Sequence, residues 1–379
     1  MPKRIMASDH RPIVIDNGSA CMKGGFGGED EPRAIFETKI GHACSHKLST
    51  INEESDHESS QRWRDDGWRG LSLSCPIQNG LITDWDAVEK LWNHMFQNGL
   101  GTSPSQHAVI LTEPPLNPKH NRETITKIMF DRFRVPALFL QSQAVLSLSA
   151  TNRSTGIVVE LGEGFSHCVP IFEGFTLPHA VTRVDIGGQR LTEFLGDLLA
   201  ERGFLFSSTH ANLEQLREIK EKLCYVALDF EQETNRDPNF MSRSIELNGQ
   251  TICLSSERFR CPEALFQPKL LGLDTAGIHE QVINAIMKCD PDLIPNLFRN
   301  IVVSGGTSLF PGLPERLQKE IKARAAPSAK VTIIAPPGRQ YAAWIGGSVV
   351  ASLRNREGLW ISRGDFDEFG PSVVHRRCF

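Results

Sequence analysis

The sequence predicts an α/β fold built from two similar halves. Strand-like and helix-like segments alternate along most of the chain, which is typical of the α/β class. Two short loops also share one pattern: a run of β-branched residues, a carboxylate, a turn of small residues and a return to apolar sequence. These loops span residues 13–20 and 157–167. Because the pattern is repeated, we expect a related strand–turn–strand unit in each half.

The first loop reads Ile13-Val14-Ile15-Asp16-Asn17-Gly18-Ser19-Ala20. Asn-Gly is first of all a hairpin signal, and either loop taken alone can be an ordinary hairpin tip. The pair has a further interpretation, because the N–H groups of two glycine-bearing turns can face each other and bind a polyphosphate. The leading carboxylates, Asp16 and Glu160, would then hold the waters of a metal ion. Together the loops predict a nucleotide held by two similar halves.

The first part of the chain combines strands with one biased segment. Residues 11–37 predict two or three strands broken by glycines. Residues 44–70 are rich in polar and charged side chains, and we expect an exposed loop or a small subdomain there. Trp63 and Trp68 would either anchor this segment or mark a contact surface.

Helices and strands follow in turn. A helix near Trp85–Gln97 is expected to begin after Asp84, which is an N-cap candidate together with Thr83. A strand at 108–112 precedes a helix at 121–133, whose apolar face contains Ile125, Ile128 and Met129.

A third glycine site lies at residues 301–312. A buried strand enters a glycine turn that opens a helix around Pro314–Ala323, so backbone N–H groups and a helix N-terminus would be accessible to a ligand. The alternative is a tight turn that only packs on its neighbour. Residues 342–348 contain Gly346-Gly347 and predict a close-packed helix crossing without chemistry.

Composition excludes several classes of protein. The 379 residues are 40% hydrophobic and 23% charged, which is enough for two or three domains. The net charge of −4 provides no basic excess for nucleic acid or an anionic membrane. The longest nearly apolar stretches, 135–150 and 341–353, are too short for a bilayer, and residues 1–10 lack the apolar core of a secretion signal. Nine cysteines at irregular spacing predict free thiols in a reducing compartment.

These pieces, in this order, resemble the actin family from about Pro12 to Phe379. The most specific stretches are LTEPPLNPK at 111–119, QAVLSL at 143–148, IKEKLCYVALDFEQE at 219–233, RFRCPEALF at 258–266 and the ending VHRRCF. Runs of this length are far more specific than one glycine loop.

The resemblance implies the duplicated actin-type ATPase fold, which is ribonuclease H-like and has two halves around a nucleotide cleft. It assigns residues 1–37, 76–150 and 342–379 to the base of the outer domain, and residues 38–75 to its small lobe. Residues 151–186 and 274–341 would form the base of the inner domain, and residues 187–273 its lobe. The two loops become phosphate loops, and residues 305–310 become the adenosine site.

The resemblance also implies roles for single residues. The expected catalytic residues are Asp16 and Glu160, which would hold Mg²⁺ or Ca²⁺ through water, Gln143, which would hold the attacking water, and His167 near that water. The plainer interpretations are a hairpin cap for Asp16, a polar helix start for Gln143 and a satisfied core histidine for His167. The remaining contacts to ATP or ADP are expected from Asn17, Gly18, Ser19, Ala20, Lys23, Gly162, Glu163, Gly164, Phe165, Gly188, Lys220, Glu221, Gly305, Gly306, Thr307, Leu309, Phe310 and Gln340.

Some site residues depart from the family pattern. Glu160 and Glu163 stand where the family has Asp, so each carboxylate is one methylene longer. A displacement of about 1 Å can lower a rate by about 10²-fold, so we expect binding to be retained and hydrolysis to be slow. Ala20 replaces glycine, which requires a negative φ. Near the purine, the family's Met, Tyr and Lys are replaced by Leu309, Phe310 and Gln340.

The expected assembly surfaces depart further. The loop at 44–54 is polar and charged where actins have an apolar, glycine-rich loop, and interface cores are usually depleted in charge. The cleft where partner helices bind actins has lost an aromatic side chain and gained a cation, through Ser149, Asn152 and Arg356 in place of Tyr, Gly and Phe. Pro170–Ala180 and Leu270–Glu280 keep a family character, so part of the longitudinal surface is expected to survive.

Two functions follow from the resemblance. The first is an ATP-binding actin-like cytoskeletal protein of the cytoplasm, with nucleotide-gated self-assembly and slow ATP hydrolysis. The alternative is a non-polymerising actin-related protein, an ATP-clamped subunit of a cytoskeletal-regulatory or chromatin-remodelling complex, for which a nuclear location is an option. The expected partners are the protein itself, actin-binding proteins or complex-forming proteins, and neither nucleic acid nor membrane. A small-molecule kinase of this fold would need a catalytic Asp and a substrate pocket, for which the sequence offers no candidate.

Overall fold

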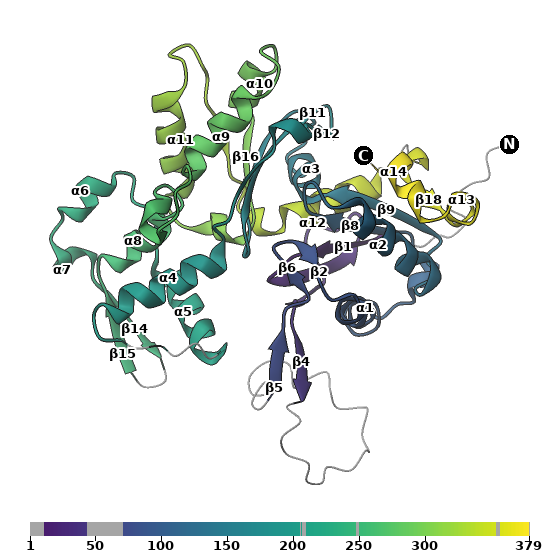
Figure 1. The fold of residues 1–379 in the computed structure, drawn as a ribbon, viewed down its shortest axis with the longest axis horizontal. Helices are drawn as coiled ribbons and strands as arrows, with labels where there is room; N and C mark the ends of the chain where they lie inside the picture. Colours follow the sequence, from purple (N-terminus) through teal and green to yellow (C-terminus); the bar gives the residue numbers. More distant parts are fainter. Residues whose placement is uncertain are drawn as a thin grey trace, which may run out of the picture. The chain divides into compact units, whose positions relative to one another are not determined.

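The computed structural model describes residues 11–43, 71–204, 206, 210–247, 250–353 and 357–378. The chain forms two compact units (Figure 1). Unit 1 contains Met1–Glu113, Asn117–Leu140 and Ala351–Cys378, and unit 2 contains Pro114–Leu116 and Gln141–Val350. The polar segment at 44–70, with Trp63 and Trp68, lies outside the described residues, as does Arg356. The four-part division implied by the resemblance stays a prediction.

Unit 1 is built on a six-stranded sheet in the order β18-β9-β8-β1-β2-β3. Its strands are β1 (Ile13–Asn17), β2 (Cys21–Phe26), β3 (Ala34–Glu37), β8 (Val109–Glu113), β9 (Ala137–Ser142) and β18 (Ile361–Ser362). Two hairpins are formed by β4 (Ile40–Ala43) with β5 (Leu71–Ser74) and by β6 (Ile77–Gln78) with β7 (Leu81–Ile82). The helices are α1 (Trp85–His94), α2 (Lys119–Asp131), α13 (Arg363–Phe369) and α14 (Val374–Arg377).

The predicted elements of this unit are confirmed, with small shifts at their ends. Helix α1 begins where Asp84 caps it, since the Asp84 carboxylate accepts a hydrogen bond from the Ala87 N–H at 3.0 Å. A π-helical turn, Met95–Gly99, extends α1 past the predicted end. Helix α2 begins two residues earlier than predicted, directly after Pro118.

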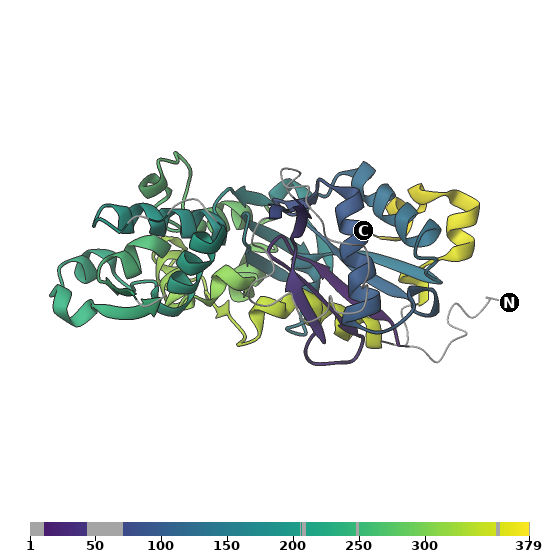
Figure 2. The same ribbon diagram turned by 90° about the horizontal axis from the view of Figure 1, so that it is seen from below.

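The C-terminal helices α13 and α14 lie beside α2 in both views (Figures 1 and 2). Arg122 of α2 donates to the Cys378 carbonyl at 2.8 Å, and Arg363 donates to the Phe130 carbonyl at 2.8 Å. The Phe130 and Phe366 rings stack with their centroids 4.7 Å apart. The end of the chain is therefore part of the packing of unit 1.

Unit 2 is built on a second six-stranded sheet, with the path β12-β11-β10-β16-β17 and β13 paired to β11. Its strands are β10 (Gly156–Leu161), β11 (Ser166–Phe172), β12 (Phe175–Thr176), β13 (Thr182–Val184), β16 (Ile301–Ser304) and β17 (Ile333–Ile334), with a separate hairpin of β14 (Arg243–Leu247) and β15 (Gln250–Leu254). Its helices are α3 (Gln143–Ser149), α4 (Gly188–Ala200), α5 (His210–Leu223), α6 (Phe230–Thr234), α7 (Pro238–Met241), α8 (Glu257–Glu263), α9 (Ile278–Met287), α10 (Ile294–Arg299), α11 (Leu313–Arg324) and most of α12 (Ala342–Ser352).

The two main sheets repeat one topology, which confirms the predicted duplication. In unit 1 the strands run β3-β2-β1-β8-β9, and in unit 2 they run β12-β11-β10-β16-β17. Each begins with antiparallel neighbours and then pairs its first strand in parallel with a strand from much later in the chain, β1 with β8 and β10 with β16. Each therefore places a strand–turn–strand loop next to the carboxyl end of a parallel neighbour.

Strand β10 shows how unit 2 forms its core. Ile157, Val159 and Leu161 belong to the large apolar cluster that includes residues of α4, α9 and α11. Val158 belongs instead to a cluster with Ala144 and other residues of α3. Side chains alternate along a strand, so both faces of this sheet are covered and the run is apolar without interruption.

Helix α12 crosses α3 at close range. A Cβ atom on Gly346 would lie 1.8 Å from the Leu146 carbonyl oxygen, so only glycine permits this approach. The predicted close crossing is thus confirmed. Within the described part of the chain, no helix combines the length and the apolar character that crossing a bilayer requires.

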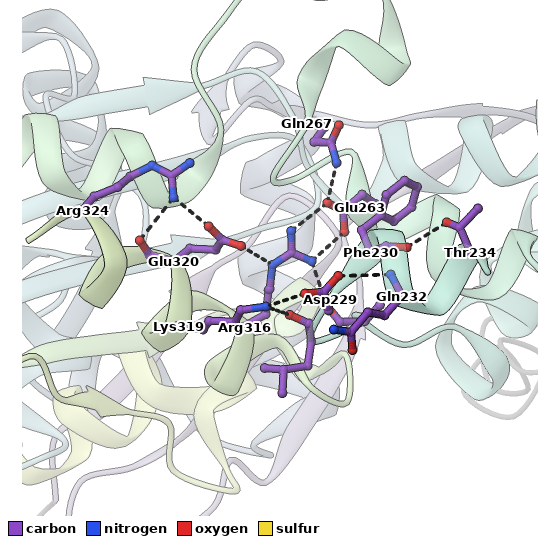
Figure 3. Close-up of polar contacts among 12 residues, drawn as sticks. Asp229, Phe230, Gln232, Thr234, Glu263, Gln267, Arg316, Lys319, Glu320 and Arg324 are labelled. Carbon is purple, nitrogen blue, oxygen red and sulfur yellow. Dashed lines mark hydrogen bonds and ion pairs between the residues drawn. The ribbon is translucent and has the colours of Figure 1, made fainter. Parts of the chain in front are cut away.

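A buried ion pair connects α8 to α11 in unit 2 (Figure 3). The Arg316 guanidinium donates to both carboxylate oxygens of Glu263 at 3.0 and 3.1 Å, and to the Ala227 carbonyl at 2.8 Å. Glu263 is fully buried. Burial raises the pKa of Glu263, whereas the hydrogen bonds from Gln267 and Arg316 oppose that rise. Arg316 therefore gives the buried Glu263 carboxylate a cation and a hydrogen bond to each of its oxygens.

We expect Arg316→Met to lower the free energy of unfolding by about 3–5 kcal/mol, because it leaves Glu263 buried without its cation. Urea denaturation of the purified protein measures this change. Lys319→Met is the matched control, since Lys319 forms an ion pair with Asp229 at 3.0 Å on the exposed surface, where water screens it. If both variants shift the urea midpoint equally, the buried ion pair contributes no more to the free energy of unfolding than the exposed one.

Candidate functional site

The turn between β1 and β2 carries a pair of opposite charges. Asp16 and Lys23 stand opposite each other in the antiparallel register, and the Lys23 Nζ lies 2.9 Å from the Asp16 Oδ2. The Thr112 hydroxyl donates to the other oxygen of Asp16, Oδ1, at 2.8 Å. Asp16 is almost fully buried. Its carboxylate is thus fixed at the end of β1 by groups from two neighbouring strands.

Asn17 is held by Thr112 of β8 and by Trp92 of helix α1. Its backbone N–H donates to the Thr112 hydroxyl at 2.9 Å, and its side-chain amide donates to the Thr112 carbonyl at 3.0 Å. The indole N–H of Trp92, in α1, donates to the Asn17 Oδ1 at 2.9 Å. Neither Thr112 nor Trp92 was a predicted site residue. The available signal for Thr112 was its position at the end of a strand parallel to β1.

The three turn residues Gly18, Ser19 and Ala20 leave their backbone N–H groups without an acceptor among the described residues. Their carbonyl and hydroxyl groups are in use: the Thr38 hydroxyl donates to the Gly18 carbonyl, and the Gly80 N–H donates to the Ser19 Oγ at 3.1 Å. Ala20 is not among the described residues with positive φ, so replacing the family's glycine causes no backbone strain. These N–H groups are available to an anion.

The second turn, between β10 and β11, is built from backbone bonds. The Gly162 carbonyl accepts from the Gly188 N–H at 2.9 Å and from the Thr307 hydroxyl at 2.8 Å. The Glu163 carbonyl accepts from the N–H of Gln189 at 2.9 Å. The turn, the start of α4 and the third glycine site are therefore joined.

Glycine is required where these segments meet. A Cβ on Gly188 would lie 2.4 Å from the Glu163 Oε2, and a Cβ on Gly305 would lie 2.2 Å from the Leu161 carbonyl. Gly305 also has φ +90°. Gly306 differs, because a Cβ there would meet no atom of the described residues within 4 Å. We call the place where the second turn, the start of α4 and the third glycine site meet the cradle. It is tightly packed at Gly188 and Gly305 and has open space at Gly306.

Polar residues form a row across the neighbouring strands of unit 2. Glu160 pairs with His167 in the antiparallel register and with Ser304 in the parallel register. Ser304 and His167 are buried, and the Ser304 Oγ and His167 Nδ1 have no hydrogen-bond partner among the described residues. Buried polar atoms of this kind need an explanation, such as an unseen ligand or water.

His167 is neutral at physiological pH. Burial, together with the nearby Arg183 guanidinium, lowers the pKa of His167 to about 4, although the Asp185 carboxylate opposes this shift. The His167 ring also lies edge-on to Phe165 at 4.3 Å, and Arg183 lies over the face of Phe165 at 4.9 Å. A neutral imidazole offers one donor and one acceptor to a water molecule.

The expected purine contacts are only partly brought together. The buried Lys220 Nζ donates to the Gly188 carbonyl at 2.6 Å and to the Thr192 hydroxyl at 2.8 Å, so it joins α5 to the start of α4. Phe310 is buried, whereas Leu309 is 42% exposed. Glu221 is exposed and forms an ion pair with Arg217 on its own helix.

The structure also places Gln143 and Gln340, two more of the expected site residues. Gln143 begins α3 directly after β9, which is the helix start of its plainer interpretation, and its role toward an attacking water stays a prediction. The Gln340 Oε1 has no hydrogen-bond partner within the described ranges. Its neighbour Arg339, which was not predicted, fixes the third glycine site: its carbonyl accepts from the Gly305 N–H at 3.0 Å, and its guanidinium donates to the Ser308 carbonyl at 2.9 Å.

Each unit contains groups that fit part of a nucleotide with a divalent cation. In unit 1 the N–H groups at Gly18–Ala20 and the Lys23 ammonium suit phosphate oxygens, and the Asp16 carboxylate suits a hydrated cation. In unit 2 the Glu160 carboxylate also suits a hydrated cation. The open space at Gly306 and the unpartnered Ser304 and His167 atoms leave room for a ligand and its water.

The sequence matches a protein-family model. The model described as Actin matches residues 7–379, which is nearly the whole chain. The match agrees with the duplicated sheet topology and with the two carboxylate-led turns. This chain belongs to the actin family.

Proposed function

We propose that this protein is an ATP-binding, actin-like cytoskeletal protein that hydrolyses ATP slowly and self-assembles under nucleotide control. Family membership supports the proposal, because actin family proteins generally bind a nucleotide with a divalent cation and self-assemble or bind partner proteins. The observation that carries it is the cradle of unit 2, in which Gly162 joins Gly188 to Thr307 next to open space at Gly306. The corresponding location is the cytoplasm and its cytoskeleton.

In this proposal the two turns have separate tasks. Gly18, Ser19 and Ala20 donate backbone N–H groups to phosphate oxygens, and Lys23 adds a point charge. Asp16 and Glu160 hold Mg²⁺ or Ca²⁺ through water, and the bound cation would neutralise charge on the phosphate oxygens. Gly164 and Phe165 complete the second turn, and the purine lies toward Gly306, Leu309, Phe310 and Gln340.

The first prediction concerns binding. Saturating Mg-ATP should raise the melting temperature, since a ligand at 100 times its Kd stabilises the native state by about 2.7 kcal/mol. Gly306→Phe should abolish the shift, because it fills the open space. Gly358→Phe, at a second position where a Cβ would meet no atom within 4 Å, is the control and should keep it. A wild-type melting curve that millimolar Mg-ATP leaves unchanged would refute the proposal.

For hydrolysis, Gln143 orients the attacking water and His167 contributes a neutral ring. A carboxamide orients water without removing its proton, which suits a slow hydrolase. The extra methylene of Glu160 shifts its carboxylate from the position that the family's Asp supplies, and this favours slow turnover.

Gln143→Ala should lower ATP turnover roughly 10- to 100-fold and leave ATP affinity nearly unchanged, as expected when a transition-state contact is lost. Between about pH 6 and 8, turnover should show no step caused by His167, whose pKa of about 4 lies below that range. Single-turnover phosphate release measures the effect of Gln143→Ala on hydrolysis and its dependence on pH.

Glu160→Asp should raise turnover, because it restores the shorter carboxylate of the family. A further decrease in turnover would contradict the argument from the extra methylene of Glu160.

The alternative is a non-polymerising actin-related protein that serves as an ATP-clamped subunit of a cytoskeletal-regulatory or chromatin-remodelling complex. The polar sequence at 44–54 favours it, because charged side chains in an interface core are costly to desolvate. It would permit a nuclear location. Both candidates require the same ATP site, so assembly decides between them.

Sedimentation with Mg-ATP makes this decision. We expect self-assembly weaker than that of actin, so the protein should stay largely in the supernatant at concentrations where actin pellets. Replacing residues 45–54 by an apolar, glycine-rich loop should lower its critical concentration, since less charge is then desolvated. Robust pelleting of the wild type would establish the polymerising candidate, whereas a soluble protein that copurifies with a constant set of partners would establish the alternative.

A further inference from the structure

Asn17 makes the connection between the first turn and the rest of unit 1. It is the last residue of β1, and the turn Gly18–Ala20 follows it directly. Its contacts include two hydrogen bonds with Thr112 on β8, at 2.9 and 3.0 Å, and one from Trp92 on α1, at 2.9 Å. The Thr112 bonds continue the sheet, whereas the Trp92 bond reaches Asn17 from a residue 75 positions away in sequence.

Trp92 is a rigid donor. Its side chain is fully buried, and its ring lies edge-on to Phe133 with the centroids 6.3 Å apart. The indole has one polar hydrogen and no acceptor, so Asn17 Oδ1 satisfies its hydrogen-bonding capacity. Helix α1 itself is fixed at its start by the Asp84 cap. The direction of the Trp92 N–H is therefore set by packing.

We propose that Trp92 is a positioning residue for the phosphate-binding turn. This inference rests on the proposed function. By holding the Asn17 side chain, the indole N–H fixes the backbone at the start of the turn, so that the N–H groups of Gly18, Ser19 and Ala20 are oriented before the phosphates bind. Preorganised donors bind more tightly because less conformational freedom is lost on binding.

The bonds of Thr112 do not make Trp92 redundant. Thr112 bonds the backbone N–H and the amide nitrogen of Asn17, and these contacts hold the strand end against β8. Trp92 bonds the other end of the carboxamide, the Oδ1. Removing the indole N–H would take a donor from this buried oxygen, and the Asn17 side chain would lose its contact with α1.

The test compares ATP affinities. Trp92→Phe keeps an aromatic ring beside Phe133 and removes the N–H, and it should raise the Kd for Mg-ATP roughly 5- to 30-fold by calorimetry. Trp360→Phe is the matched control, since Trp360 is also a buried tryptophan of unit 1 in contact with a phenylalanine, Phe139. Its ATP affinity should stay within about twofold of the wild type.

Two further measurements separate positioning from general stability. If Trp92 acts through Asn17, the double variant Trp92→Phe/Asn17→Ala should bind Mg-ATP as Asn17→Ala alone does, because the second change removes nothing more. Amide hydrogen exchange at Asn17, whose N–H is bonded to the Thr112 hydroxyl, should quicken in Trp92→Phe and stay unchanged in Trp360→Phe. Should Trp92→Phe not fold, benzothienylalanine at position 92 keeps the ring size and lacks the N–H.

The outcomes are distinct. An unchanged Mg-ATP affinity in Trp92→Phe, or losses that multiply in the double variant, would overturn the inference while the proposed function stands. No binding of Mg-ATP by the wild type would reject the proposed function and this inference with it. Three results together would establish the inference. Trp92→Phe must bind Mg-ATP more weakly, Trp360→Phe must bind it as the wild type does, and the double variant must bind it as Asn17→Ala does.

Discussion

The backbone carbonyl of Gly162 is the contact on which the arrangement of unit 2 depends. It accepts hydrogen bonds from the Gly188 N–H and the Thr307 hydroxyl, so one atom joins the second turn, the start of α4 and the third glycine site. The approach is possible because Gly188 and Gly305 have no Cβ, which would otherwise collide with Glu163 or with the Leu161 carbonyl. Lys220 then extends the connection to α5 through the Gly188 carbonyl.

The two units share a strand order and fix their turns by different chemistry. In unit 1 the strand parallel to β1 is β8, whose penultimate residue, Thr112, holds Asp16 and Asn17 with its hydroxyl and carbonyl. In unit 2 the strand parallel to β10 ends in Ser304, which is followed by two glycines. There the backbone carbonyls of the turn accept hydrogen bonds from backbone N–H groups and from the Thr307 hydroxyl. The first turn is consequently sensitive to single side chains, and the second to the size of its glycines.

The longer carboxylates of this chain have different surroundings. Glu163 lies against Gly188, where the missing Cβ leaves space for its carboxylate, so the extra methylene is accommodated. Glu160 instead stands in a strand between β11 and β16, in register with His167 and Ser304. A side chain in that row has less freedom to compensate for its length. The structure therefore gives a physical reason to expect nucleotide binding and hydrolysis to respond differently to the two substitutions.

The sequence by itself determined the α/β class, the duplication, the positions of several strands and helices, among them α1 and α2, and the residues that form the two turns. Those features follow from local signals: apolar periodicity, the Asp84 cap, and glycines at turns. Only the tertiary structure decided how the turns are held. Thr112, Trp92, Thr192 and Arg339 carry no local signal for this task, because their partners are distant in sequence. The ends of α1 and α2 shifted for a related reason, since a helix end depends on caps and packing as much as on periodicity.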